Sequence, residues 1–337
     1  MPLVAVPLEK IAIIMNSSQV AEAKGDLARL SLAFRLTFKE GPLGPFKVVG
    51  RASLIAWSLQ YSVMGFVFML MDTTLSKLMG VPRVVYGKEL MEPPGVRSSL
   101  RSKAGEGLNH NYSVGSGGHG GARLQSALSG QHGPPTASTA ALGGAKMVMA
   151  PLLAGSIESV VANRAEVQRY YGIDKFASIE KSLNWDAIRR TCGPAYLANV
   201  SRNFIMSSTS FILTPITFKA WYPQERKSTQ TLFWYGLGMN IFVGNSIAIT
   251  QQALWGRALD YGAQNGGRPI VYSEVVREGL KTEGVAAFYT PAKWFTRVLM
   301  NAPVQGTLPW FYNEVLPQFE GPVRRLAASV AASMASK

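Results

Sequence analysis

Cysteine and histidine are almost absent from this chain. Cys192 is the only cysteine among 337 residues, which excludes an internal disulfide. The three histidines, His110, His119 and His132, share one Gly- and Ser-rich stretch that has no cluster of acids or cysteines, so we expect no metal site. No acid–base pair or activated nucleophile is recognisable elsewhere. The sequence therefore predicts a protein that is not an enzyme and needs no cofactor.

Charge is also scarce. Only 16% of the residues are Asp, Glu, Lys or Arg, against roughly 25% in typical soluble proteins. The deficit is concentrated in uncharged stretches, among them the 20 residues 52–71 and the 29 residues 228–256. About 20 mostly apolar residues in a helix cross the hydrocarbon core of a bilayer. We therefore expect an all-α membrane protein, with a soluble protein of buried core helices as the alternative.

Positive charge exceeds negative charge without forming a stripe. The net charge of +14 comes from 34 Lys and Arg against 20 Asp and Glu, and it is spread over the loops between the apolar stretches. This distribution suits loops that face anionic lipid headgroups and does not favour nucleic acid as a partner. No loop is basic enough to fix the orientation in a membrane.

A weak internal repeat is the most informative feature of the chain. A charged motif ends an apolar stretch three times, at residues 7–10, 164–169 and 252–257. The last two copies start 88 residues apart and the first two 157 apart, an excess of 69 that matches one Gly-, Ser- and Pro-rich insertion. The predicted units are repeat 1 (1–80), the insertion (81–146), repeat 2 (147–222), repeat 3 (223–320) and a C-terminal tail (321–337).

Each repeat is predicted to form a helix, a polar connection with a short helix, and a second helix. The expected ranges are 3–20, 26–38 and 52–77 in repeat 1, 147–171, 176–183 and 196–221 in repeat 2, and 231–261, 273–282 and 295–315 in repeat 3. Only six residues precede Pro7, so the first helix is expected to be shorter than the others.

Taken together, these motifs and their spacing resemble the mitochondrial carrier family. The stretches 193–203 and 297–306 are similar to even-numbered carrier helices, and Glu283-Gly284 is similar to the Glu-Gly pair that follows the short helix. The resemblance implies a six-helix bundle of the mitochondrial inner membrane: three tandem repeats, each with two transmembrane helices and a short matrix-side helix. It also implies contact with membrane lipids, including cardiolipin.

The resemblance further implies ion pairs that close the matrix end of the bundle. An acid of each odd-numbered helix would pair with a base of the next, which here gives Glu9 with Arg169 and Glu166 with Arg257. The third pair would be Leu254 with Ala12, both uncharged. Loss of both partners together is physically reasonable, because replacing a buried pair by apolar groups can be neutral, whereas one charge left alone is costly.

Substrate contacts of carriers lie midway through the even-numbered helices. Transferred to this chain, they fall near Gln60, Leu197 and Asn301. A buried anionic substrate would need a cationic partner, and only Gln60 and Asn301 here could form a hydrogen bond. Arg202 and Arg297 could reach inward, or they could extend toward headgroups from the helix ends.

Two hypotheses for function follow. The proline of the charged motif survives only in the first copy, and the bases expected at the ends of the even-numbered helices are missing. These losses favour a non-transporting structural subunit of a large inner-membrane assembly such as a respiratory-chain complex. Other subunits would contact it through residues 81–146 and the shortened first helix. The alternative is an active, divergent carrier that exchanges a small, weakly charged metabolite.

Overall fold

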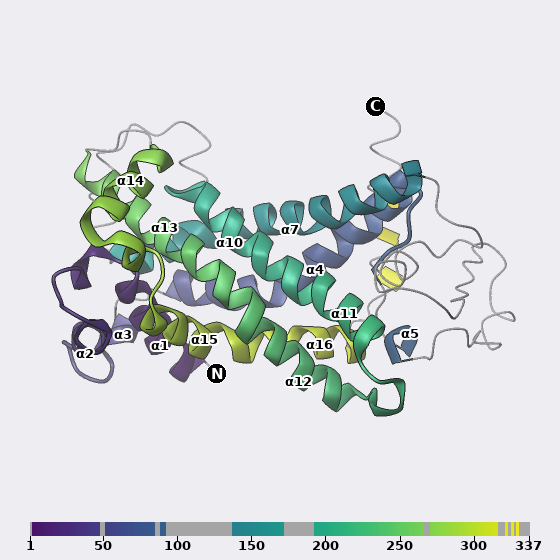
Figure 1. Ribbon diagram of the computed structural model, residues 1–337, viewed down its shortest axis with the longest axis horizontal. Coiled ribbons are helices and arrows are strands. Elements are labelled where there is room, and N and C mark those ends of the chain that lie inside the picture. Colours follow the sequence, from purple (N-terminus) through teal and green to yellow (C-terminus); the bar gives the residue numbers. More distant parts are fainter. Residues whose placement is uncertain are drawn as a thin grey trace, which may run out of the picture.

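The structure, a computed structural model, describes residues 2–47, 51–84, 88–91, 137–171, 192–265 and 270–315, with a few residues between 321 and 329; at 51–63 only the backbone is described. Within these ranges the protein is all-α and has no strand (Figure 1). The sequence-based prediction of an all-α protein is therefore confirmed. The three histidines and the expected helix 176–183 lie outside the described residues.

The described helices fall into three parts of the chain. In the first part of the chain they are α1 (Pro2–Met15), η1 (Ser18–Val20), α2 (Asp26–Thr37), α3 (Gly44–Lys47), α4 (Arg51–Met79) and α5 (Lys88–Met91). The middle part has α7 (Ala137–Tyr171), α10 (Tyr196–Ser208), η3 (Thr209–Leu213), α11 (Thr214–Trp221) and η4 (Gln224–Arg226). The last part has α12 (Thr229–Met239), η5 (Asn240–Gly244), α13 (Asn245–Gln264), α14 (Tyr272–Glu283), η6 (Gly284–Ala287), α15 (Pro291–Gln305) and α16 (Leu308–Glu314).

Helix α7 differs from the expected range. It begins at Ala137 instead of residue 147, so ten residues assigned to the insertion belong to a helix. The sequence 137–146, ASTAALGGAK, has four alanines, the best helix former, and these offset its two glycines. The insertion is therefore shorter than its composition predicts.

Three of the expected helices are interrupted at their middle. α10 and α12 each pass into a π-helical segment, η3 and η5, and α15 is separated from α16 at Gly306 and Thr307. Asn240 connects the interruptions: its amide nitrogen donates to the Gln305 carbonyl at 3.3 Å, and its oxygen accepts from Ser210 at 3.2 Å. π segments commonly mark functional positions in helices. Here they bring polar side chains into the interior of an otherwise apolar bundle.

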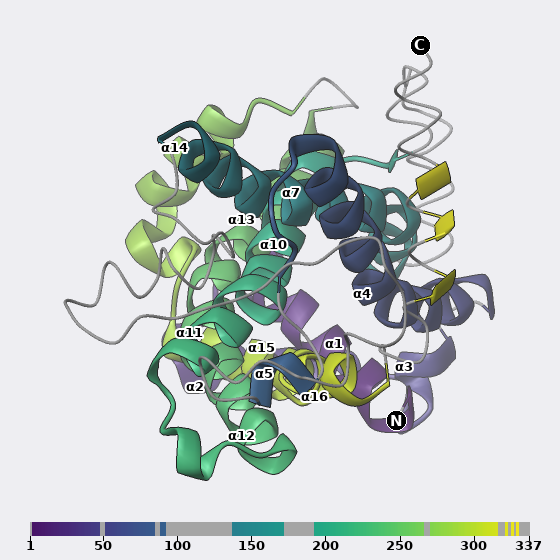
Figure 2. The same cartoon turned by 90° about the vertical axis from the view of Figure 1, so that its right-hand side faces the viewer.

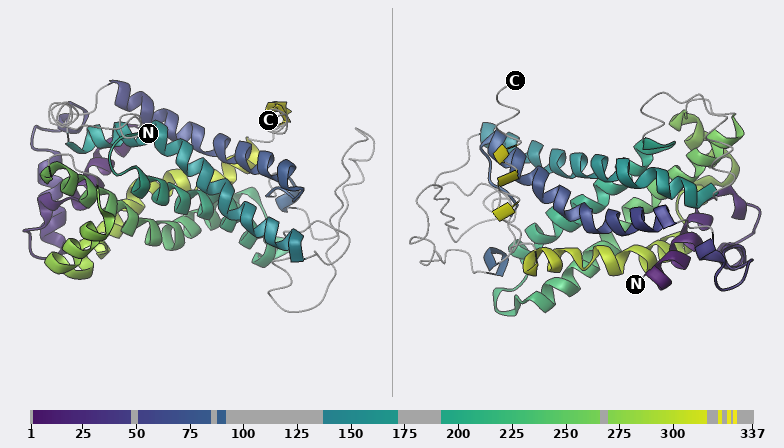
Figure 3. Two further views of the ribbon diagram at one scale, coloured as in Figure 1. Left: turned by 90° about the horizontal axis from the view of Figure 1, so that it is seen from above. Right: turned by 180° about the vertical axis from the view of Figure 1, so that it is seen from behind.

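The long helices pack side by side in chain order (Figures 2 and 3). α4 lies along α7, α7 along α10, α10 along α13, α13 along α15, and α15 returns to α1. α1 has 14 residues and is therefore about 21 Å long at 1.5 Å per residue. It lies beside only part of the bundle.

Among the described residues, two helical stretches are long and apolar enough to cross a membrane. They are Ala140–Tyr171, of 32 residues, and Thr229–Gln264, of 36 residues. Their most apolar windows are only 28% and 39% buried within the protein. The core helix of a soluble protein would be mostly buried, so the exposure of these apolar faces favours contact with lipid.

Candidate functional site

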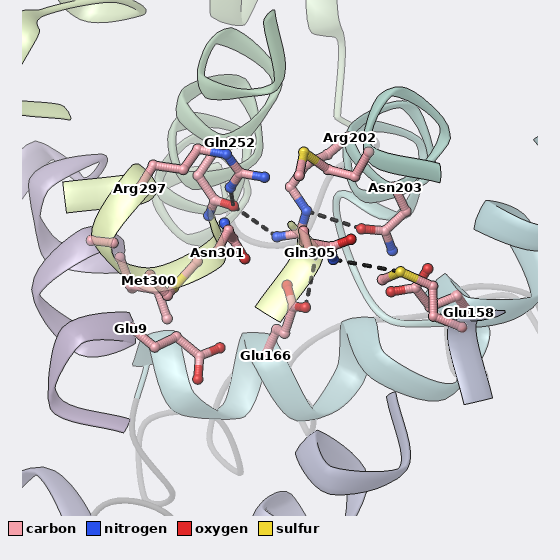
Figure 4. A pocket seen from close by; sticks show the side chains of 14 residues that line it. Glu9, Glu158, Glu166, Arg202, Asn203, Gln252, Arg297, Met300, Asn301 and Gln305 are labelled. Atoms are coloured by element: carbon pink, nitrogen blue, oxygen red, sulfur yellow. Dashed lines mark hydrogen bonds and ion pairs between the residues drawn. The ribbon is translucent and has the colours of Figure 1, made fainter. Parts of the chain in front are cut away.

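A cavity lies in the middle of the bundle, where six helices meet (Figure 4). Its lining comes from α1, α4, α7, α10, α13 and α15: Glu9, Ala12, Ile13, Met64, Glu158, Glu166, Arg202, Asn203, Met206, Gln252, Arg297, Met300, Asn301 and Gln305. The space open to the centres of water molecules is about 20 Å³, which is room for one or two waters. In this conformation the cavity is polar and too small for a metabolite.

The first predicted ion pair is present. Arg169 of α7 donates to Glu9 of α1 at 3.0 Å, and both side chains are buried. The other carboxylate oxygen of Glu9, Oε2, has no hydrogen bond within the described part of the chain. A buried pair of this kind ties two helices together, because removing one partner leaves a charge in a low-dielectric interior.

The second predicted pair is wrong. Glu166 binds Arg202 of the neighbouring α10 at 2.8 Å and also accepts from Asn199 at 3.0 Å. Arg257 instead binds Glu283, the last residue of α14, and its Nε donates to the Ala287 carbonyl at 3.1 Å. The prediction considered only odd-numbered helices as partners. α10 packs directly against α7 and brings a guanidinium to Glu166, whereas Arg257 lies beside the segment that follows α14.

Arg202 and Arg297 face the interior. They are 6% and 2% exposed, and both donate to the same oxygen of Gln252, at 2.7 Å and 3.0 Å. Of the two orientations that the sequence left open, the outward one is therefore wrong. Gln252 occupies the first position of the third charged motif, where its carbonyl oxygen accepts from two cations.

The remaining predicted residues are divided between the interior and the surface. Asn301 and Ala12 are buried and line the cavity, and Leu254 packs partly buried beside the cluster that contains Ile13. Leu197 is 64% exposed, so its assignment to the cavity is wrong: it lies on the outer face of α10, one position before the inward-facing Ala198. The side chain of Gln60 lies outside the described residues.

A network of amides and hydroxyls between α7 and α10 was not predicted. Asn199 accepts from Ser159 at 2.9 Å and donates to Asn163 at 3.0 Å, and Asn203 donates to Ser159 at 3.0 Å. The spacing of four residues between Ser159 and Asn163, and again between Asn199 and Asn203, places each pair on one helix face. This spacing was the signal that could have revealed the network.

Acids and bases in and around the cavity are equal in number. The buried acids are Glu9, Glu158 and Glu166, and the buried bases are Arg169, Arg202 and Arg297. Hydrogen bonds to ionised groups are about twice as strong as neutral ones, so these contacts hold the interior in a defined arrangement. The cavity offers little net charge to an incoming ion.

In comparisons with protein-family models, with curated proteins and with solved structures, this chain has no significant match.

Proposed function

We propose that this chain is a carrier-like protein of the mitochondrial inner membrane that no longer transports and serves as a structural subunit of a large assembly. The order of its described helices supports the three-repeat architecture. Three helices follow one another as α1, α2 and α4, with α2 the shortest, and a long helix, a short helix and a long helix follow as α12–α13, α14 and α15–α16. The chain-order packing that returns from α15 to α1 supports a six-helix ring.

The observation that carries the proposal is an aromatic plug, formed by Phe68 of α4, Phe211 of η3 and Tyr312 of α16. The ring centres of Phe68 and Phe211 are 4.8 Å apart, and those of Phe211 and Tyr312 are 4.6 Å apart. All three side chains are at most 1% exposed. A transporter needs a passage that can open at each end of the bundle. The plug fills the interior at the end that contains α5, α11 and α16.

The backbone of α4 accommodates the plug through a glycine. A Cβ atom placed on Gly65 would lie 0.8 Å from the Tyr312 hydroxyl oxygen. A side chain at this position would occupy the space of the Tyr312 ring, so Tyr312 of α16 reaches α4 at Gly65.

Alternating access needs two states of similar energy, each closed by contacts that can break. At one end the Glu9–Arg169 pair could break and re-form. At the other end, opening would expose three large apolar rings, each of which contributes about 1.5–3 kcal/mol when buried. This asymmetry favours a permanently closed scaffold.

Partner subunits and lipids follow from the same proposal. The exposed apolar faces of α7 and α12–α13 would contact acyl chains, with cardiolipin among the lipids, or neighbouring subunits. Residues 81–146 and the end of the short α1 are the proposed contacts with other subunits.

A native gel tests the proposal. The tagged chain, solubilised from mitochondria in mild detergent, should migrate with a large complex and co-purify with its subunits in fixed ratio. Migration as a single small species under the same detergent, with known complexes intact in the neighbouring lane, would contradict it.

An active, divergent carrier for a small, weakly charged metabolite is the second candidate, and the polar cavity favours it. Arg202, Arg297 and Asn301 line the central cavity, where their polar groups would bind a small solute in a more open state of the bundle. Uptake of amino-acid-sized solutes into liposomes that contain the purified chain, abolished by Arg202→Ala, would support it. No uptake by correctly folded protein would exclude it for the solutes tested.

A further inference from the structure

The segment that leaves α4 is held in place by a buried ion pair. Asp72 of α4 binds Lys146 of α7 at 2.7 Å, and its other oxygen accepts from the Val84 backbone N–H at 2.9 Å. The Lys146 ammonium also donates to the Pro82 carbonyl at 2.6 Å and to the Ser76 hydroxyl at 3.1 Å. Both charged side chains are almost fully buried. Residues 81–84 are therefore fixed to the ends of α4 and α7.

A second attachment lies on other helices. Leu90 of α5 is 1% exposed and packs in an apolar pocket with Phe218 of α11 and Leu232 of α12. The amide of Gln224 donates to the carbonyl of Met91 at 2.8 Å. Each contact holds α5 against the connection between α11 and α12.

These two attachments are close in sequence and belong to different parts of the bundle. Leu90 lies only six positions after Val84, so the chain between them can extend by at most about 20–22 Å. Figure 2 shows the end of the bundle at which α5 lies in front of α16, with α4 on one side and α11 and α12 on the other. A short length of chain therefore limits how far α4 and α7 can move from α11 and α12.

We propose that the two anchored segments, residues 81–84 and 88–91, form a strap that locks this end of the bundle against opening. The aromatic plug fills the interior, and the strap keeps the helices around it from separating. The strap goes beyond the proposed function, because it restricts the separation of the helices whether or not the protein joins a larger assembly.

The chemistry of the two attachments suits segments that resist separation of the helices. A buried ion pair costs several kcal/mol per ion in desolvation and is tolerated when additional hydrogen bonds satisfy it. Asp72 and Lys146 have such bonds, and two of them go to the backbone of the strap. Leu90 gives the other attachment, where truncation to alanine removes buried apolar contacts without introducing a charge.

Pulsed electron resonance on the purified full-length chain tests the strap. Spin labels at Leu78→Cys of α4 and Trp234→Cys of α12, both exposed, in a Cys192→Ser background report the separation of the two sides. Leu90→Ala, and more strongly Leu90→Ala with Gln224→Ala, should shift the distance distribution to longer and broader values. Leu90→Met, which keeps the volume, and Leu280→Ala at the exposed surface of α14 should leave it unchanged.

Two outcomes would overturn the strap. One is an unchanged distance distribution in the Leu90→Ala protein while its helicity by circular dichroism stays normal. The other is global loss of helicity in that variant, because Leu90 would then support the whole fold and not one end of it. Neither readout depends on assembly or transport, so failure of the strap and failure of the proposed function are distinguishable.

Discussion

The two halves of the bundle are closed in different ways. The half that contains α1, α14 and the start of α15 is closed by charges: Glu9 with Arg169 inside, and Glu283 with Arg29 and Arg257 near the surface. The half that contains α5, α11 and α16 is closed mainly by aromatic rings and by Leu90, with one buried ion pair, Asp72 with Lys146. Breaking a buried ion pair leaves a charge in a low-dielectric interior, whereas opening an aromatic core exposes apolar area. In the proposed function, the first half corresponds to the gate of a carrier and the second half stays closed.

Of the substitutions that break an ion pair, Glu166→Ala is expected to lower the free energy of unfolding most. Glu166→Ala leaves Arg202 in the interior without its carboxylate, and we expect a loss of about 3–5 kcal/mol in the free energy of unfolding. Chemical denaturation in detergent, followed by circular dichroism, measures it.

A double-mutant cycle shows which partner matters for Glu166. Glu166 and Arg202 should be coupled, whereas Glu166 and Arg257 should be additive within about 0.5 kcal/mol. Strong coupling of Glu166 to Arg257 would restore the pairing that the sequence alone predicted.

The next effect concerns the aromatic half. Gly65→Ala places a methyl group in the space of the Tyr312 ring, and overpacking of a core typically costs about 1–3 kcal/mol. Gly238→Ala in α12 is the matched control, because its Cβ would meet no atom within 4 Å. The control should be neutral or slightly stabilising, since alanine favours a helix over glycine by about 0.5–1 kcal/mol. Equal melting temperatures for the two variants would contradict the close contact between α4 and α16.

The smallest effect is expected at the surface of the charged half. Glu283→Gln removes the carboxylate shared by Arg29 and Arg257, whose side chains are 11% and 13% exposed. The substitution keeps an oxygen that can accept a hydrogen bond and leaves the size of the side chain unchanged, so we expect a loss of about 1 kcal/mol. Because the three side chains are partly buried, this loss should change little between low salt and 1 M salt. A loss as large as that of Glu166→Ala would mean that the pairs of Glu283 stabilise this half of the bundle as much as the interior pair does.

The sequence predicted the helices well and the contacts less well. The ranges of α2 and α14 follow from apolar periodicity and match within one residue. The Glu9–Arg169 contact followed from the resemblance to mitochondrial carriers. The partner of Glu166 did not, because a linear motif does not show that Arg202 on α10 is nearer than Arg257.

The aromatic half was not predicted at all. Phe68, Phe211 and Tyr312 come from three distant segments, and nothing in their local sequence indicates that they meet. Gly65 is an ordinary helix glycine in the sequence, and its role depends on a neighbour 247 positions later. The π segments were also missed, since one extra residue per turn leaves no trace in an apolar stretch.

Access to the central cavity from each side of the membrane tests the closed interior most directly. In the Cys192→Ser background, Met300→Cys and Asn301→Cys place thiols on the cavity, and Leu280→Cys of α14 places one on the exposed surface outside the two apolar stretches. The cavity thiols should resist a membrane-impermeant reagent from both sides of oriented vesicles, while all three react after denaturation. Rapid labelling of the cavity thiols from the side of α5 and α16 would show that the aromatic half opens and would contradict the closed scaffold.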